Sequence, residues 1–288
     1  NPQMNPKWSI TVHFTPYGSE TEQTLESYTS LPIGLKDAGE YRIVYTVSAD
    51  YHVTETLQEF DFTIMPADIE FSMSDIDGLT YTGNTFSEIR GAAHGVGSPE
   101  FTYVFTVTGT ETDDTAVSET VTGWTDLKNV LIDAGSYEVL CTVSAPNHAT
   151  NSSVSFHVTI ANAKMSVSPN LQESYPYSGA PIVSDGLFAL KSSAEHVTTV
   201  QNPAWTFEVK GTSYNDLGMA LGDIINAGEY TITYSVSAKN HDPLGPVEIK
   251  LEITKAILEF DEDRLAQHIG SGTPGIDFDS KIIYGDDA

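Results

Sequence analysis

The sequence predicts an all-β protein built from tandem β-sandwich modules. One thirteen-residue pattern occurs three times, as DAGEYRIVYTVSA at 37–49, DAGSYEVLCTVSA at 133–145 and NAGEYTITYSVSA at 226–238. Ala38 and Ala134 are 96 residues apart, and Ala134 and Ala227 are 93 apart. That period suits one small independent domain and is too long for a solenoid repeat. Apolar and polar residues alternate within each copy, which indicates a half-buried strand.

Each copy also predicts what surrounds this strand. An Ala-Gly pair, which is a turn signal, precedes it, and a short polar break containing a histidine follows it. A second alternating run comes next, as LQEFDFTI at 57–64, SVSFHVTI at 153–160 and PVEIKLEI at 246–253. The pattern is therefore strand, turn, strand. The tyrosines Tyr41, Tyr137 and Tyr230 begin the face that should point into a core.

Module boundaries follow from an alanine that opens a new strand after each second run, at Ala67, Ala163 and Ala256. The predicted modules are a first (1–66), a second (67–162) and a third (163–255). Residues 256–288 are interpreted as the opening strands of a fourth module or as complementing strands for a neighbour. The first module has no Y-x-G element and no opening strand before the strand at 7–14, so we expect it to be incomplete at its N-terminal side.

Upstream elements recur as well. The runs KWSITVHF at 7–14, FTYVFTVTG at 101–109 and AWTFEVKG at 204–211 predict one equivalent strand, whose inward phase carries Trp8, Tyr103 and Trp205. The runs LTYTG at 79–83, YPYSG at 175–179 and IIYGD at 282–286 follow the module boundaries. Several short strands within about 95 residues, with turn signals between them, are typical of a β-sandwich.

The Asp-Ala-Gly-x-Tyr start of the repeated strand resembles the tyrosine-corner region of immunoglobulin-like domains. More narrowly, the tandem arrangement resembles the bacterial Ig-like repeats of large cell-surface and adhesin proteins, over almost the whole chain. Ile43, Val139 and Ile232 stand where antibody domains place a cysteine, so apolar packing must replace the disulfide there. The resemblance implies tandem immunoglobulin-like β-sandwich modules arranged as a rod, in an extracellular bacterial stalk or adhesin. It identifies no ligand.

The two ends of the chain suggest a pairing. The N-terminal piece, 1–66, and the C-terminal piece, 256–288, together have about the length of one repeat. One interpretation is a segment cut from a longer array of modules. The other is head-to-tail assembly, in which the C-terminal strands of one molecule complete the N-terminal module of the next by β-strand addition. Both interpretations stay open at the level of sequence.

The charge excludes several classes of partner. The chain of 288 residues has 13 Lys and Arg against 40 Asp and Glu, a formal net charge of -27. Nucleic-acid binding needs clustered cations, and so does binding to an anionic membrane surface, so we expect neither. No apolar stretch of 18 residues occurs, which predicts no membrane insertion. The acid excess favours solubility and repulsion between neighbouring modules.

Enzyme motifs are missing, and we expect no catalytic residues and no enzymatic activity. The sequence has no G-x-S-x-G, P-loop or dinucleotide-binding turn. His52, His148 and His241 hold equivalent positions in the three copies, which indicates a turn residue with a locally bonded ring. The lone Cys141 falls on the inward face, where a small buried hydrophobe is expected.

Acidic residues near turns offer the only metal candidates, and we expect no other cofactor. The run SDIDG at 74–78 places Asp75 and Asp77 two residues apart, and Asp113 and Asp114 are adjacent. An EF-hand loop starting at Asp75 is excluded because its twelfth position is Phe86. A looser Ca²⁺ site remains an alternative to plain turns at these four carboxylates.

The function that these observations favour is a non-enzymatic extracellular structural protein. It is an acidic, rod-like segment of a bacterial surface stalk or filament, with copies of itself or further repeats as partners. The alternative is an adhesin or a module that binds a host or cell-surface glycan or protein through loop aromatics. The loop-like stretches carry Tyr17, Tyr28, Tyr51 and Tyr214 for that purpose. A Lys–Asn cross-link would need a core-facing lysine, and Lys36 is the one candidate.

Overall fold

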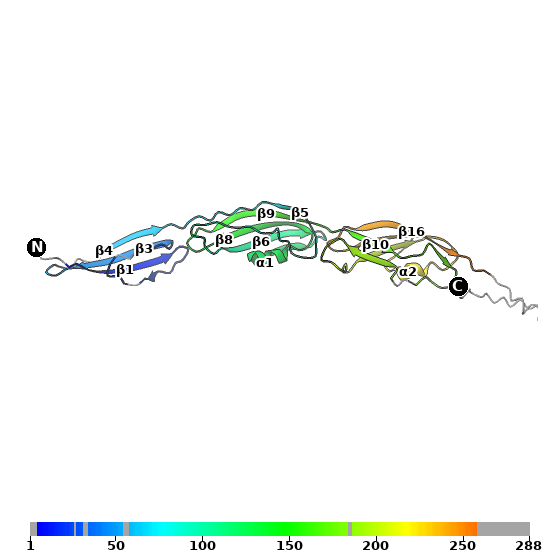
Figure 1. The fold of residues 1–288 in the computed structure, drawn as a ribbon, viewed down its shortest axis with the longest axis horizontal. Coiled ribbons are helices and arrows are strands. Elements are labelled where there is room, and N and C mark those ends of the chain that lie inside the picture. Colours follow the sequence, from blue (N-terminus) through cyan, green and yellow to red (C-terminus); the bar gives the residue numbers. More distant parts are fainter. Residues whose placement is uncertain (1–4, 26, 31–33, 54–57, 184–185, 258–288) are drawn as a thin grey trace, which may run out of the picture. The chain divides into compact units, whose positions relative to one another are not determined.

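The computed structural model describes residues 5–25, 27–30, 34–53, 58–183 and 186–257 (Figure 1). They divide into two compact units, one from Asn1–Leu79 with Thr85–Ile160 and one from Thr80–Asn84 with the residues that follow Ile160. Strands dominate both units, so the all-β prediction is confirmed.

The first module is a four-stranded sheet. Its strands are β1 (Lys7–Pro16), β2 (Gln23–Thr24), β3 (Gly39–Ser48) and β4 (Gln58–Ile64), in the order β2-β1-β3-β4. Three partly buried side chains from the loops, Leu25, Tyr28 and Leu35, cover its apolar face. The buried core comprises Ile10, Val12, Phe14, Tyr41 and Ile43.

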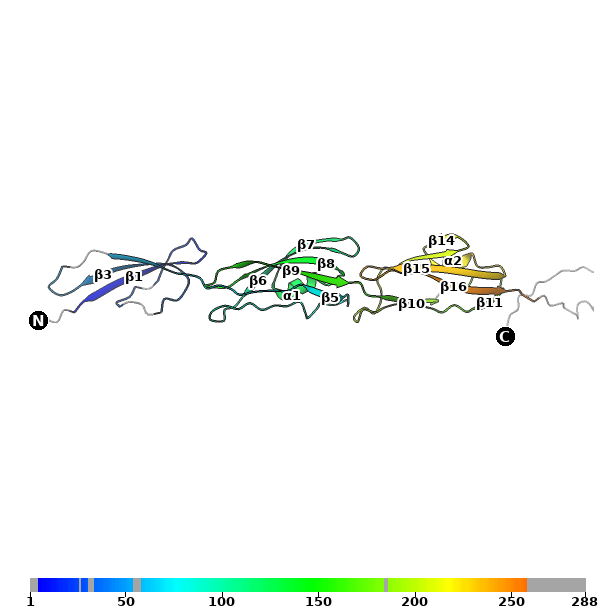
Figure 2. The same ribbon diagram turned by 90° about the horizontal axis from the view of Figure 1, so that it is seen from above.

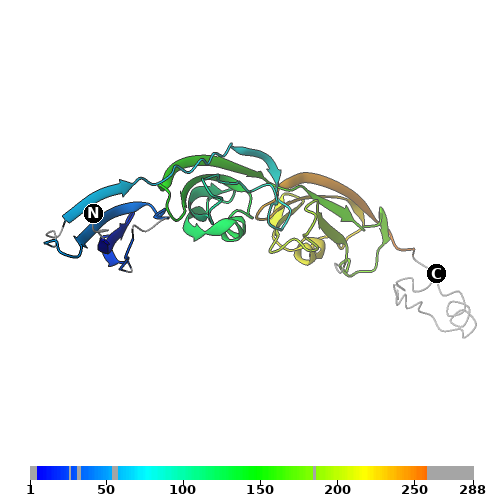
Figure 3. The same ribbon diagram turned by 60° about the vertical axis from the view of Figure 1, so that its left-hand side comes forward.

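The second module has a five-stranded sheet in the order β5-β9-β8-β6-β7. Its strands are β5 (Ile76–Thr80), β6 (Thr102–Glu111), β7 (Ala116–Thr122), β8 (Gly135–Ser144) and β9 (Asn151–Ala161). The other layer of the sandwich comes from less regular segments, which bury Ile69, Phe71, Phe86, Ile89 and Ala93. The helix α1 (Gly123–Val130) lies against β6 and β7 (Figure 3).

The third module packs a two-stranded sheet, β10 (Met165–Pro169) and β12 (Phe188–Ser192), onto a five-stranded one. The larger sheet has the order β11-β16-β15-β13-β14. Figure 2 labels four of these strands, β11, β16, β15 and β14. Its strands are β11 (Ser174–Pro176), β13 (Ala204–Val209), β14 (Thr212–Tyr214), β15 (Gly228–Ser237) and β16 (Leu244–Thr254). Val167 and Phe188 from the small sheet pack on the core of the large one, which completes the β-sandwich.

Two short helices depart from the predicted pattern of strands and turns. They are α1 in the second module and α2 (Leu217–Gly222) in the third. Both are shorter than the window that makes helical periodicity visible in a sequence. Both nonetheless contribute to the cores, since Leu127 of α1 and Leu221 of α2 are fully buried. Each helix leads from the strands β6–β7 or β13–β14 to the Ala-Gly corner.

Trp8 lies on the predicted inward face of β1, the face of the buried Ile10, Val12 and Phe14, but it is not buried there. Its side chain is 42% exposed and leans on Tyr45, with ring centroids 6.2 Å apart. Trp205 has the same register, facing Val236 as Trp8 faces Val47, and it is partly buried beneath Phe188. Among the described residues, the loop side chains Leu25, Tyr28 and Leu35 pack on the core that begins at Ile10, and Trp8 is not part of that cluster. Tyr103 is partly buried in the second module, between Phe105 and Trp124.

Cys141 is fully buried on β8, and this burial raises the pKa of its thiol to about 12. Since the thiolate is the reactive form, we expect the native protein to react with a thiol reagent far more slowly than a free cysteine does. The reaction should become fast in denaturant. Ellman's reagent measures both rates, and a Cys141→Val variant provides the blank. Rapid labelling of the folded protein would contradict this position.

Candidate functional site

The three predicted corner tyrosines lie in the cores. The hydroxyl group of each donates a hydrogen bond to the backbone carbonyl oxygen four residues earlier: Tyr41 to Asp37 at 2.9 Å, Tyr137 to Asp133 at 2.8 Å and Tyr230 to Asn226 at 2.7 Å. The exposed fractions of the three residues are 3%, 2% and 5%. The corner therefore fixes the entry into β3, β8 and β15 with the same bond each time, which is the arrangement of a tyrosine corner.

The glycine of the repeated Ala-Gly pair has a steric cause in the first module. Gly39 has a φ of +151°, and a Cβ atom added there would lie 2.2 Å from the carbonyl oxygen of Thr15. Only glycine avoids both the backbone strain and the clash with β1. The corner is thus held by a close backbone approach on one side and by the tyrosine hydroxyl on the other.

The turn after β8 binds the corner of the preceding module. The side-chain Oδ1 of Asn147 accepts the backbone N–H of Ala38 at 2.8 Å, and its Nδ2 donates to Asp37 Oδ1 at 3.0 Å. The carbonyl oxygen of Asn147 accepts the N–H of Ala67 at 3.0 Å, at the predicted module boundary. One asparagine therefore ties the first module's corner, the boundary and the second module together. We call this arrangement the asparagine clasp.

Replacing Asn147 tests the clasp. Its φ is +64°, a left-handed conformation that asparagine and glycine adopt more readily than alanine. Asn147→Ala removes both side-chain bonds and adds backbone strain, so we expect a loss of about 2 kcal/mol in the free energy of unfolding. Asn147→Gly removes the bonds alone and should cost about 1 kcal/mol. Urea unfolding followed by fluorescence measures both. Equal stability of the two variants and the parent would contradict the clasp.

The three repeated histidines are turn residues, as predicted from their repetition. In each, Nδ1 hydrogen-bonds the carbonyl oxygen two residues earlier, at 2.8 Å in His52 and 2.7 Å in His148 and His241. His148 and His241 are buried. Nε2 of His241 also bonds Ser192 Oγ at 2.7 Å, whereas Nε2 of His148 has no partner within the described part of the chain. This geometry serves the turns and offers no base to a substrate.

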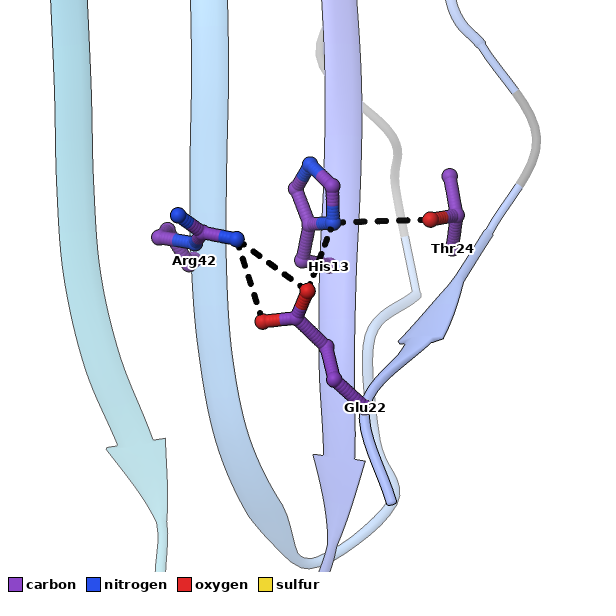
Figure 4. Close-up of polar contacts among 4 residues, drawn as sticks. All are labelled: His13, Glu22, Thr24 and Arg42. Carbon is purple, nitrogen blue, oxygen red and sulfur yellow. Dashed lines mark hydrogen bonds and ion pairs between the residues drawn. The ribbon is translucent and has the colours of Figure 1, made fainter.

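Sequence reasoning missed a cluster of polar residues on the first sheet (Figure 4). Glu22 approaches Arg42 of β3 through both carboxylate oxygens, at 3.1 Å, and His13 of β1 at 3.1 Å. His13 also lies 3.4 Å from Thr24 Oγ1 of β2. Glu22 and Arg42 are 47% and 41% exposed, so such a pair stabilises by about 0.2–1 kcal/mol. The cluster holds the loop before β2 against the sheet, and its one hydroxyl, Thr24 Oγ1, approaches the same ring nitrogen of His13 as Glu22 does.

The structure does not bring the Ca²⁺ candidates together. Asp75 accepts the backbone N–H of His157 at 2.7 Å and lies 3.2 Å from its ring Nδ1. Asp113 accepts the N–H of Thr115 in the hairpin between β6 and β7, and Asp114 has the φ of +66° of a tight turn. Asp77 lies exposed within β5. No group of three or more His, Cys, Asp and Glu side chains in the described ranges is arranged to hold a metal ion.

Asp75 predicts a response to acid. The hydrogen bonds from the backbone and ring of His157 lower the pKa of this carboxyl below its ordinary value of 3.8. A lowered folded-state pKa stabilises the folded protein above the ordinary carboxyl pKa, and this stabilisation is lost as the pH falls through the folded value. We therefore expect Asp75→Asn to flatten the decline of the melting temperature below about pH 4. An unchanged decline, with Asp77→Asn as the control, would contradict this contribution.

The predicted aromatic platform is not assembled in the first module. Tyr17 and Tyr51 are 53% and 100% exposed. The two tyrosines lie near opposite ends of β3. Tyr17 comes directly after Pro16, which pairs with Gly39 at the start of β3, whereas Tyr51 comes shortly after Ser48 at its end. Ten strand residues separate these ends, which is about 30 Å. Tyr28 packs on the core, and the hydroxyl of Tyr214 bonds Asp223. Lys36 is exposed, so its expected inward direction is wrong.

A cavity of about 500 Å³ lies in the third module, beside the corner at Ile225. Its described lining holds no acid, histidine, lysine or cysteine, and its polar groups come from uncharged side chains: Asn170, Gln172, Tyr175 and Ser178. General acid–base or nucleophilic catalysis needs a titratable or activated group within reach of a substrate. The one titratable side chain of the described lining, Tyr175, accepts the backbone N–H of Gln172 through its hydroxyl at 2.9 Å, and most of the rest of the lining is suited to apolar contact.

The known proteins that are similar to this chain are found among solved structures. No family model matches the chain, and no curated protein does. A solved tetra-tandem repeat from the extending region of a large adhesion protein matches at 14% identity and a TM-score of 0.33, over 87% of this chain and 68% of that one. The FN1–FN3 domains of chicken CNTN1 match at 12% identity, a TM-score of 0.19 and coverages of 85% and 89%. Drosophila N-cadherin EC1-3 matches at 11% identity and a TM-score of 0.25, over 89% of this chain and 91% of that one.

Helices among the described residues are too short and too polar to cross a membrane. At the identities and TM-scores above, the neighbours leave the function to be inferred from the residues of this chain. Those residues supply repeated structural corners, a clasp at a module boundary and surface ion pairs.

Proposed function

We propose that the chain is a non-enzymatic extracellular structural protein. It forms an acidic, rod-like segment of a bacterial surface stalk or filament, and its partners are further repeats or copies of the same chain. The filament form joins copies head to tail by strand complementation. Bacterial origin and surface location come from the resemblance of the repeats, and they are the parts that need direct testing.

The observation that carries this proposal is the asparagine clasp. A protein whose task is to hold modules in series needs a bond from one module's rigid corner to the next module's turn. Asn147 makes that bond to Asp37 and Ala38, and beside it a parallel bridge joins Ala67, at the predicted boundary, to His148. The boundary itself is short, so few residues are available to bend.

The charge supports a role in spacing. A net charge of -27 favours repulsion between neighbouring acidic modules along the chain. The described residues also lack an assembled metal cluster, and the described lining of the cavity beside Ile225 holds no carboxylate, histidine, lysine or cysteine. A glycan-binding role would need the loop aromatics to converge, and Tyr17 and Tyr51 lie at opposite ends of a strand.

Two measurements test the proposal. Antibodies raised against the purified chain should label intact, unpermeabilised cells of the source organism, and brief protease treatment of those cells should remove the label. Small-angle scattering of the purified protein at low ionic strength should give an elongated profile. Labelling only after permeabilisation would overturn the location, and a compact scattering profile would overturn the rod.

A further inference from the structure

We propose that the free edge of β4 binds residues 278–284 of a second copy as a parallel strand. This inference rests on the filament form of the proposed function and names the segment, the edge and the register. The surface consists of β4 and its apolar side chains Phe60, Phe62 and Ile64, and we call it the β4 edge.

The β4 edge is open where its counterparts are covered. In the second and third modules, β5 pairs with β9 and β11 with β16, at the edge opposite β8 and β15. In the first module β4 is the last strand of the sheet, and no described strand lies on its outer side. An unpaired strand edge presents backbone N–H and C=O groups that are ready to pair with another chain.

Exposure of the apolar side chains marks the same edge. Phe60 pairs with Ile43 on β3 as Phe156 pairs with Val139 on β8, so the two phenylalanines are equivalent. Phe156 is 1% exposed and Phe60 is 58% exposed. The next two inward positions of β4 show the same difference from β9. Phe62 and Ile64 are half-buried, whereas the equivalent Val158 and Ile160 are buried. The first sheet thus presents an apolar strip that its counterparts keep covered.

The covering strand has a recognisable register. In the third module β11 is parallel to β16, with Tyr175 opposite Ile253, and Tyr177 donates its N–H to the carbonyl oxygen of Thr254 at 3.0 Å. In the second module Tyr81 donates to the carbonyl oxygen of Ala161 at 2.8 Å. The residue equivalent to Thr254 and Ala161 on β4 is Met65, which is 76% exposed.

Residues 278–284, FDSKIIY, fit this register. Tyr284 stands where Tyr81 and Tyr177 stand in the repeated LTYTG, YPYSG and IIYGD runs. Its N–H would therefore bond the carbonyl oxygen of Met65. Two residues earlier, Ile282 corresponds to Tyr175 and falls opposite Ile64. Phe278 corresponds to Leu171, which packs on the third module's core, and falls opposite Phe60.

Electrostatics set the conditions for binding. Both copies carry a net charge of -27, and acids outnumber cations near the contact: β4 carries Glu59 and Asp61, and the tail carries Asp277 and Asp279 beside one cation, Lys281. Like charges at this distance repel, and the repulsion is screened as ionic strength rises. Apolar burial and backbone pairing drive the association, so it should strengthen between 0.05 M and 0.5 M salt.

A complementation experiment with the full chain tests this head-to-tail contact. Phe60→Ser removes a side chain from the edge, and Ile282→Ser removes one from the tail. Each should weaken self-association about tenfold or more, because burial of a large apolar side chain contributes that much. Met219→Ser is the control, since Met219 is 60% exposed on α2 and belongs neither to β4 nor to residues 278–284.

Sedimentation velocity from 1 to 100 µM at high salt gives the readout. The parent and Met219→Ser should form open-ended oligomers, while each edge or tail variant stays monomeric. An equal mixture of Phe60→Ser and Ile282→Ser retains one intact edge and one intact tail, so it should form dimers and nothing longer. A parent that stays monomeric, or a mixture that behaves as its two components do, overturns this proposal. Surface labelling and elongated scattering by a monomeric parent would leave the stalk form of the proposed function standing.

Discussion

Replacing Phe156 by alanine is expected to lower the free energy of unfolding of the second module by about 3–5 kcal/mol, because it empties a fully enclosed site in the core. Phe60→Ala removes the same atoms at the equivalent position of the first module and should cost about 1 kcal/mol or less, since Phe60 is 58% exposed. We therefore expect Phe156→Ala to lower the free energy of unfolding several times more than Phe60→Ala does.

Tryptophan fluorescence makes this comparison by module. Each predicted module contains one tryptophan, namely Trp8, Trp124 and Trp205. Urea unfolding of variants that keep a single tryptophan reports the module that carries it. Similar losses from Phe156→Ala and Phe60→Ala would show that Phe60 is buried in solution.

Tyr137 is the second position with a large expected effect. Tyr137→Ala removes a ring that is 2% exposed and should cost about 3–5 kcal/mol. Tyr137→Phe keeps the ring and removes only the bond to the carbonyl oxygen of Asp133, so it should cost about 1 kcal/mol. The difference separates ring packing from the corner bond.

Denaturant unfolding with Trp124 as the reporter measures both variants, and Tyr81→Phe is a control for the loss of a phenolic hydroxyl outside the corner. A Tyr137→Phe variant as stable as the parent would mean that the corner bond adds nothing. If Tyr137→Phe lowered the free energy of unfolding as much as Tyr137→Ala does, the ring itself would contribute little.

Much of the fold was predictable because alternation and the repeated corner are local signals. The inward phase of β3, β8 and β15 follows from a period of two, and the tyrosines at their starts could be placed in the cores from their spacing alone. The strands β4, β9 and β16 follow by the same reasoning. In each case the residues that form the element also carry the pattern that identifies it.

The missed features depend on contacts between distant residues. Helix α1 has eight residues, too few for a visible period, and Trp124 is placed by Phe105, with ring centroids 4.8 Å apart. The alternation places Trp8 inward, but its exposure depends on what covers the sheet. Alternation assigns a face to a side chain and leaves unknown whether a second layer extends over that face.

The asparagine clasp was also beyond the sequence. Asn147 and Asn240 share a position, and Tyr51 occupies it in the first copy, which signals a left-handed turn. The partner of Asn147 is Asp37, 110 residues earlier, and nothing local indicates that contact. For the Ca²⁺ candidates the reverse holds. Their acidic residues are close in sequence, but the folded chain does not bring them together into one site.

The parallel pairing of β11 with β16 has a mechanical consequence. β11 lies near the start of the third module and β16 near its end, and the two run in the same direction side by side. Tension applied at the two ends of this module pulls these strands past each other along their length. Their hydrogen bonds are then loaded in shear, all at the same time, and do not break one after another. Resistance to pulling is governed by the rate of unfolding, so the third module is built to yield slowly under load.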